Sequence, residues 1–337
     1  MGIEPEFRIM IPCRESLLLV FVFSASLVRA QTFDLEQFEQ IFRPRLRLEG
    51  RYMPEAAFRD TSGHFGSTDG TAVITFPIRS HFDVGMKLDT SARGLGDLLK
   101  KSIRVQASQV LGNVRVGVRQ VELGFDSAAT RNLYSASLGM LGVKLTRKYR
   151  VLFWSANVNV SEEDATFDRA ALRCNAVIGQ LHVNGLRRQF FYGLALSYAD
   201  RLTLPVPFLG GTAPLGKEWS FQYLLPVQLA VGFRPHARTR FLAGVGFDAF
   251  RSGIQWPGED RSNMDHAALR AFLQVRHKAG AHVQVRGEAA YALAHAVRFG
   301  DADPARYPVL PGLVVGAGVN IFFGGSVLER VMDEVLR

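Results

Sequence analysis

The strongest constraint on the fold is a run of alternating side chains between Leu269 and Leu293. Its first half places an apolar residue at nearly every second position and polar residues between them, with Phe272 as the exception. After Lys278-Ala279-Gly280 the alternation restarts. A period of two belongs to a β-strand, because successive side chains leave opposite faces of the sheet. Two such runs joined by a glycine-containing link predict a β-hairpin.

This hairpin has one apolar face and one face of charged and amide groups. A soluble sheet could turn the polar face to water, whereas a membrane barrel would enclose it around a lumen. The composition limits the choice: 337 residues, 47% hydrophobic and 21% charged, are typical neither of a disordered chain nor of a helical membrane protein. The 32 glycines and 25 phenylalanines favour β structure.

The formal net charge of +9 raises the question of nucleic-acid binding. The arginines are spread singly through alternating segments, without a basic helix or a Lys/Arg-rich run, so we expect no nucleic-acid partner. Cys13 lies before the apolar run at the N-terminus, so the exported chain would keep Cys174 alone. An internal disulfide is therefore not expected.

The first 30 residues have the organisation of a secretory signal peptide. The apolar run from Ser16 to Val28 follows Arg14, and Ala30 provides the small residue before a cleavage site. The run is too short to span a bilayer as a helix; a buried N-terminal helix is the alternative. We expect 31–42 to be a short N-terminal segment or plug, and 324–337 to be a C-terminal periplasmic tail.

Fourteen alternating segments follow, and the links between them alternate in length. The predicted strands are 45–53, 71–78, 81–89, 102–110, 113–125, 131–145, 150–160, 171–185, 189–199, 218–233, 239–250, the two halves of the hairpin described first, and 311–323. The long links are 54–70, 90–101, 126–130, 161–168, 200–217, 251–266 and 297–310, and short links lie between them. Adjacent polar residues at Arg119-Gln120 predict a β-bulge.

Short turns on one side and long loops on the other are typical of outer-membrane barrels. A barrel also leaves no strand edge unpaired in lipid. We therefore predict an all-β, closed antiparallel transmembrane β-barrel over 43–323, with fourteen strands and twelve as the alternative. It would have short periplasmic turns and long external loops. A soluble periplasmic β protein is the competing fold.

The two strand faces predict which side chains meet lipid. The apolar face carries Leu, Val, Ile and Phe, with Trp or Tyr near the strand ends, as in interfacial girdles. The other face carries charges that a dry core would tolerate only in pairs. The candidate lumen-lining residues are Arg47, Glu49, Arg51, Arg104, Arg115, Arg270, Gln274, Arg276, Gln284, Arg286 and Glu288. They predict either a ladder that braces the wall or, through the arginine excess, a lumen that favours anions.

The run from 190 to 233 resembles an uncharacterised family of bacterial outer-membrane β-barrels, best known from Bacteroidetes and catalogued as a domain of unknown function. The matching features are the Pro-Val-Pro-Phe-Leu-Gly-Gly turn, the Trp after Lys217-Glu218, and Leu224-Leu225-Pro226; the start Phe-Arg-Pro-Arg-Leu-Arg-Leu-Glu-Gly-Arg-Tyr is also similar. The resemblance implies a barrel without an assigned activity. One departure is that Phe322-Phe323 is followed by residues up to Arg337, so the assembly signal would be internal.

The sequence contains no phosphate-binding loop, zinc motif, cysteine pair or nucleophile elbow. The acidic residues Glu162, Glu163, Asp164 and Asp168 are expected in a solvated external loop. We therefore expect no enzyme, cofactor or metal site. We expect instead a passive pore or solute-uptake channel, with a closed structural or surface-interaction barrel as the alternative and a barrel lipid hydrolase less favoured. Expected partners are outer-membrane lipid, the barrel-assembly machinery and a small anionic solute, at the bacterial outer membrane.

Overall fold

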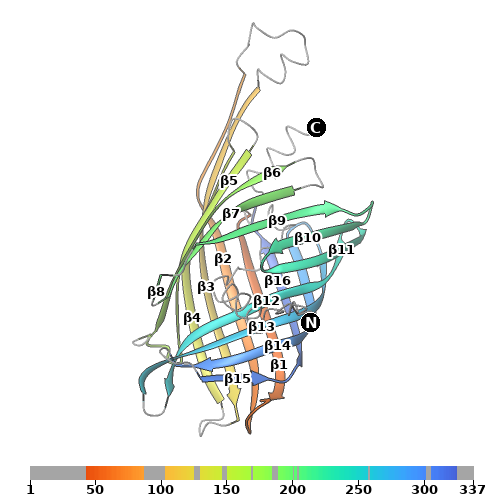
Figure 1. Cartoon of the computed structure of the whole chain (residues 1–337). Coiled ribbons are helices and arrows are strands. Elements are labelled where there is room, and N and C mark those ends of the chain that lie inside the picture. The colour runs from red at the N-terminus through yellow and green to blue at the C-terminus, as the bar shows by residue number, and fades with distance from the viewer. Residues whose placement is uncertain are drawn as a thin grey trace, which may run out of the picture.

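The computed structural model describes residues 43–86, 103–124, 130–145, 150–167, 170–183, 189–199, 201–202, 205–256, 259–300 and 305–324. Its elements are β-strands that curve around a common axis (Figure 1). The strands are β1 (Arg45–Ala57), β2 (His64–Met86), β3 (Ile103–Leu123), β4 (Thr130–Leu145), β5 (Arg150–Glu162), β6 (Ala171–Val183), β7 (Gln189–Ala199), β8 (Arg201–Leu202), β9 (Val206–Pro214), β10 (Trp219–Leu225), β11 (Gln228–His236), β12 (Thr239–Trp256), β13 (Glu259–Lys278), β14 (Val283–Phe299), β15 (Ala305–Val309) and β16 (Gly312–Phe322). No helix among the described residues is long and apolar enough to cross a membrane.

The strands close into one antiparallel barrel. Each pairs with its neighbour along the chain, except that β7 pairs with β9 and β14 with β16. Strand β16 then pairs with β1, placing Phe322 opposite Arg45, so the first and last strands complete the ring. The short β8 attaches to β7, and β15 attaches to β14, outside this ring. The predicted closed barrel of 14 strands is therefore confirmed.

The count is right, but several predicted boundaries within it are wrong. The segments 71–78 and 81–89, the latter as far as Met86 where the described residues end, belong to the single strand β2. This strand also takes up the end of the expected loop 54–70. The segments 102–110 and 113–125 likewise fall in a single strand, β3, which runs from Ile103 to Leu123. In β3, Gly112 lies opposite Phe76 and Met140 in the sheet rather than in a turn. A side-chain Cβ at Gly112 would lie 2.6 Å from the Phe76 ring, so this glycine permits a close approach.

Two further strands arise where the sequence analysis predicted other structure. The expected loop 200–217 contains β9, despite its prolines and glycines. The expected strand 218–233 is a hairpin of β10 and β11 with a turn at Pro226-Val227. These two gains offset the two mergers, which is why the total is unchanged.

The predicted sorting of long and short links has three exceptions. The expected loop 251–266 shrinks to the link 257–258, because β12 and β13 continue through most of it. The rim where β1 begins carries the long link 87–102 between β2 and β3. The opposite rim carries the short links 226–227 and 257–258. The closed ring therefore rests on the strand pairing, and not on loop length.

The predicted bulge at Arg119-Gln120 is wrong as well. Both residues are in register with β2, opposite Asp69 and Thr68. The register shift lies in the partner strand, between Pro77 and Arg79. Proline has no N–H to donate to the sheet, so a bulge at this position is physically expected.

The barrel wall narrows toward the rim away from Arg45 and Phe322. Strand β11 begins at Gln228, opposite Gly246 of β12, so the rest of β12 extends beyond it. There β12 reaches β5, where Gly253 bridges Glu162 in parallel. On the other side Phe58 bridges Val309 of β15. We call this part the narrow end; it consists of the rim-side parts of β1 to β5 and β12 to β15. The ends of β6, β7, β9, β10 and β11 are left outside it (Figure 1).

The two faces of the wall differ as the alternation predicts. Large apolar side chains are exposed on the outward face of nearly every strand; examples are Leu48, Ile74, Val116, Leu138, Val158, Leu194, Leu273 and Leu313. Tyr52, Tyr192, Tyr198, Trp219 and Tyr291 are exposed with them. Inward side chains are buried or half-buried. At the narrow end they form an apolar cluster of Met53, Phe58, Phe65, Val121, Leu123, Leu133, Phe250, Ile254, Met264, Ala290, Ala292, Val297, Phe299, Val309 and Val314, which we call the narrow-end cluster.

Candidate functional site

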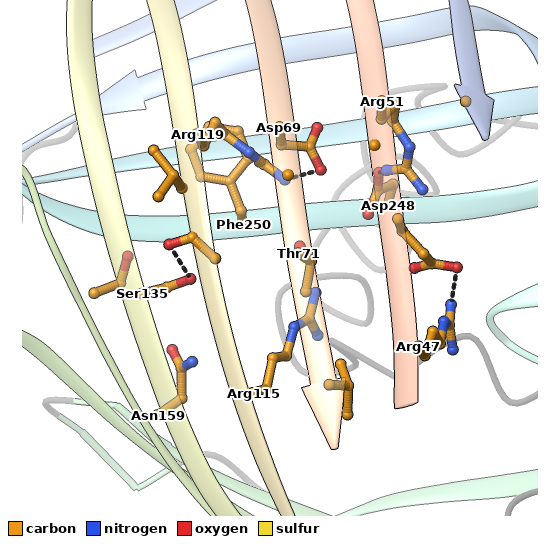
Figure 2. A pocket seen from close by; sticks show the side chains of 18 of the residues that line it. Arg47, Arg51, Asp69, Thr71, Arg115, Arg119, Ser135, Asn159, Asp248 and Phe250 are labelled. Carbon is orange, nitrogen blue, oxygen red and sulfur yellow. Dashed lines mark hydrogen bonds and ion pairs between the residues drawn. The ribbon is translucent and has the colours of Figure 1, made fainter. Parts of the chain in front are cut away.

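Next to the narrow-end cluster, on the side toward Arg45, the barrel encloses a charged cavity of about 180 Å³. Its walls come from β1 to β5 on one side and from β12, β14 and β16 on the other. Figure 2 shows Arg47, Arg51, Arg115 and Arg119 reaching into the same space as Asp69 and Asp248. These residues meet because alternate residues of each strand point into the barrel.

Glu49 of β1 lies between two arginines. Its Oε1 atom lies 2.5 Å from Nη2 of Arg47 on the same strand and 3.0 Å from Nη1 of Arg286 on β14. The second contact crosses β16, which separates β1 from β14 in the sheet. One carboxylate therefore joins strands from the two ends of the chain.

Glu288 of β14 accepts hydrogen bonds from three side chains of the inner face. It accepts hydrogen bonds from Arg270 at 2.8 Å, from Gln274 at 2.8 Å and from Arg286 at 2.5 Å. Arg276 in turn donates from Nε to the Gln274 side-chain oxygen at 2.6 Å. Hydrogen bonds to a charged acceptor are stronger than neutral ones, so this network fixes β13 against β14 on the inner face.

Asp248 of β12 carries the network across the lumen to β1. It is ion-paired with Arg51 of β1, and its Oδ2 atom lies 4.0 Å from Nη2 of Arg270. Nη2 of Arg119 lies 3.4 Å from Oδ2 of Asp69. The guanidinium carbon of Arg119 lies 3.8 Å from the centre of the Phe250 ring. The contacts to Asp248 and Phe250 therefore connect opposite walls where the barrel narrows.

Positive charge exceeds negative charge around this cavity. Its charged lining consists of Arg45, Arg47, Arg51, Arg115, Arg119 and Arg286 against Glu49, Asp69, Asp248 and Glu288. Among the described residues, the buried Nε and Nη1 atoms of Arg45 make no hydrogen bond. Buried donors without acceptors are costly, so an anion that accepted from Arg45 would find a favourable position.

The structure separates the candidate lumen residues into two groups. Arg47, Glu49, Arg51, Arg115, Arg286 and Glu288 line the cavity. Arg270, Gln274, Arg276 and Gln284 are buried on the inner face beside it. Arg104 lies on β3, but its side chain lies outside the described residues.

Four further charged lining residues were not among the candidates: Arg45, Asp69, Arg119 and Asp248. Asp69 was assigned to a loop, and Arg119 to a bulge. Asp248 is the single acid of β12 and lies within its apolar and glycine-rich stretch 241–250, and that contrast was an available signal.

The expected acidic loop is partly structural. Glu162 belongs to β5. Glu163 pairs with Arg131 at 2.7 Å, and its Oε2 accepts a hydrogen bond from the backbone N–H of Gln255 at 2.9 Å. Asp168 lies outside the described residues. Within the described part of the chain, no group of His, Cys, Asp and Glu is arranged to hold a metal ion.

Comparisons by sequence identify no relative. No protein-family model matches the chain, and no curated protein matches it either. The family suggested by the run 190–233 is therefore not identified. The motif Pro-Val-Pro-Phe-Leu-Gly-Gly, expected as a turn, lies largely in β9.

Comparisons by structure return outer-membrane barrels at low identity. An outer membrane channel from Pseudomonas putida F1 matches with 9% identity and a TM-score of 0.40, covering 83% of this chain and 96% of that one. The transport unit of the autotransporter AIDA-I from Escherichia coli matches with 9% identity and a TM-score of 0.34, covering 92% and 98%. The outer membrane protein Omp33 of Acinetobacter baumannii matches with 12% identity and a TM-score of 0.27, covering 84% and 99%.

Proposed function

We propose that this chain is a bacterial outer-membrane β-barrel whose arginine-rich lumen passes small anions. The membrane location is supported by the outward face, where leucine, valine, isoleucine and aromatic side chains are exposed around the closed ring. A closed barrel satisfies all its backbone groups within the sheet, as a lipid environment requires. In water the same face would be a large exposed apolar surface.

The single observation that supports anion passage is the charge of the cavity, with six lining arginines against four acids. Rings of arginine select anions in pores. Because each acid already contacts at least one arginine, the remaining positive charge is available to a solute. The cavity of about 180 Å³ suits a small ion with a few waters, since one water occupies about 30 Å³.

The test is a conductance measurement on purified protein in a planar bilayer under a KCl gradient. We expect stepwise conductance, with a reversal potential that is shifted toward the equilibrium potential of chloride. The variant Arg115→Gln should lower the chloride-to-potassium permeability ratio by about twofold or more, because Arg115 lines the cavity. Arg238→Gln, at the exposed turn between β11 and β12, is the control. Cation selectivity in the wild-type protein would contradict the proposal.

A closed barrel without transport is the second candidate, and the narrow-end cluster supports it. Phe65, Phe250 and Met264 come from opposite walls and are almost fully buried in this cluster. The double variant Phe65→Ala and Met264→Ala should widen the narrow end. Conductance that rises in this variant would assign the cluster to a constriction of a pore. A bilayer that stays silent with both the wild type and the variant would favour the closed barrel.

A further inference from the structure

A second cavity, of about 680 Å³, lies at the place where the barrel wall divides. On one side it is bounded by β12, β13 and β14, and on the other by the β10–β11 turn with Leu225, Pro226 and Val227. Arg173 of β6 also lines it. It exists because β11 begins opposite Gly246, so the remainder of β12 has no neighbour from β11 to continue the wall. We call it the seam cavity.

Small side chains keep the floor of the seam cavity open. Ala249, Ala267, Ala296 and Pro308 are successive partners across β12, β13, β14 and β15, and all four line the cavity. Partners in antiparallel strands share one face of the sheet. The neighbouring row on the same face, two positions before Ala249 in β12, contains Phe247 opposite Leu269. The floor is therefore an apolar trough across neighbouring strands.

The trough is continuous with the outward apolar face of the barrel. Leu229 and Val245 line the seam cavity and are also exposed, and they are paired across β11 and β12. A molecule that enters the trough from the outward side therefore comes from whatever surrounds that face. If the face lies in a membrane, this is lipid.

A row of charges borders the trough on its other side. Arg251, Asp265, Arg298 and Arg306 are successive partners across the same four strands, two positions beyond the alanine row and so on the same face of the sheet. Nε of Arg251 lies 3.8 Å from Asp265. Arg298 and Arg306 are directly opposite each other, and like charges in this position repel. Arg59 and Arg173 add two more positive charges to the lining.

We propose that the seam cavity binds one membrane lipid with an anionic phosphate headgroup. Its acyl chain lies on the alanine row, and its phosphate lies between Arg298 and Arg306. Arginine recognises phosphate with two parallel N–H donors and would relieve the repulsion between the two guanidinium groups by doing so. The volume lies within the range of about 300–1,000 Å³ of ordinary ligand sites. The proposal rests on the membrane location of the outward face, and is independent of whether the lumen conducts.

The test uses the full exported chain in vesicles that contain equal amounts of phosphatidylglycerol and phosphatidylcholine. The protein is extracted with dodecyl maltoside, and the retained lipids are counted by native mass spectrometry. We expect one retained phosphatidylglycerol per chain in the wild type. The double variant Arg298→Gln and Arg306→Gln should reduce the ratio of retained phosphatidylglycerol to phosphatidylcholine at least tenfold.

A second variant, Ala267→Phe, tests the trough itself, because its ring would fill the floor. It should retain no lipid. Ala271→Phe is the matched control, since Ala271 lies on the same strand and face, outside the cavity lining. Arg238→Gln is the control for charge. Heat-dependent migration on gels reports folding of every variant, and the arginine variant stays informative if Ala267→Phe does not fold.

Three results would overturn the proposal. One is a wild-type protein that retains no lipid or retains both lipids equally. Another is a folded Ala267→Phe variant with wild-type retention. The third is displacement of the lipid by millimolar inorganic phosphate, which would show that the arginines recognise free phosphate and that the trough contributes nothing. A barrel that is silent in conductance but retains phosphatidylglycerol would still support the lipid site.

Discussion

Glu288 shows how a single carboxylate can organise the inside of a barrel. It is 6% exposed and accepts hydrogen bonds from Arg270, Arg286 and Gln274. Each of these donors is itself on the inner face, where an unmatched charge is costly. The acid therefore stabilises β13 and β14 by neutralising arginines that would otherwise repel each other.

Replacing this acid tests its role. Glu288→Gln keeps the size of the side chain but removes its charge, so Arg270 and Arg286 lose the negative charge that they share. We expect the free energy of unfolding to fall by roughly 3 kcal/mol, as when one partner of a buried ion pair is removed. The measurement is the urea midpoint in detergent micelles. Glu218→Gln, at an exposed position before β10, should leave the midpoint unchanged; an equal effect of both variants would refute the assignment.

At this scale the sequence predicted the face of a residue but not its partner. Arg51 was assigned to the polar face from alternation alone. Its partner Asp248 lies 197 positions away in the chain. A period of two states which side of a strand a residue occupies, but long-range pairs depend on the strand order and on how the barrel narrows. Both are properties of the closed ring.

The barrel becomes narrow where β12 contacts β5, because this contact leaves the strands between them out of the ring. Gly253 bridges Glu162, and the backbone N–H of Glu163 donates to the carbonyl of Gly253 at 3.0 Å. Glu163 binds both Arg131 and the backbone of Gln255. Beside them the hydroxyl of Ser161 donates to that of Ser252 at 2.9 Å. Beyond Gly246, β12 is no longer paired with β11. These contacts hold this end of β12 against β5 instead.

A disulfide can test whether this contact exists in the folded protein. In a background with Cys174→Ser, the variant Ser161→Cys and Ser252→Cys places two thiols where the hydroxyl groups meet. We expect the disulfide to form in air, because a disulfide requires side chains that already face each other at close range. Mobility on non-reducing gels measures it. Ser161→Cys with Ser220→Cys serves as the control pair, and equal crosslinking of both pairs would argue against the narrow end.

The errors in predicting the strands have physical causes. Across the β10–β11 turn, Trp219 pairs with Phe233 and Tyr223 with Leu229. The same parity therefore faces outward on both strands, and the alternation continues through the turn as if nothing happened. Conversely, Gly112 and the bulge after Pro77 interrupt the pattern inside continuous strands. Periodicity detects a change of phase, whereas a turn is a change of direction, and the two need not coincide.

The whole molecule is organised by two surfaces of opposite character, an inner face that is charged around the cavity and an apolar outer face. The charged interior is connected across the ring from β1 to β14 and from β1 to β12. The apolar exterior is continuous around the same ring. A soluble sandwich would bury the apolar face of its strands between two sheets, whereas here the leucines of the outward face, such as Leu138 and Leu194, are exposed. Once the sheet is known to close, the alternation that predicted the strands therefore also predicts that the outward face meets lipid and not water.

Arginine variants of two leucines that are nearly equally exposed can distinguish a membrane barrel from a soluble barrel. Leu138, in the middle of β4, is 64% exposed, and Leu215, in the link between β9 and β10, is 62% exposed. In water, arginine at either position would have a similar and small effect on stability. In a bilayer, arginine at the centre of the lipid face costs about 2–4 kcal/mol, and arginine near the interface costs about 0–1 kcal/mol. Leu138→Arg should therefore destabilise the protein in lipid vesicles far more than Leu215→Arg, as measured by urea unfolding. Equal effects of the two variants would mean that the exposed leucines do not face hydrocarbon.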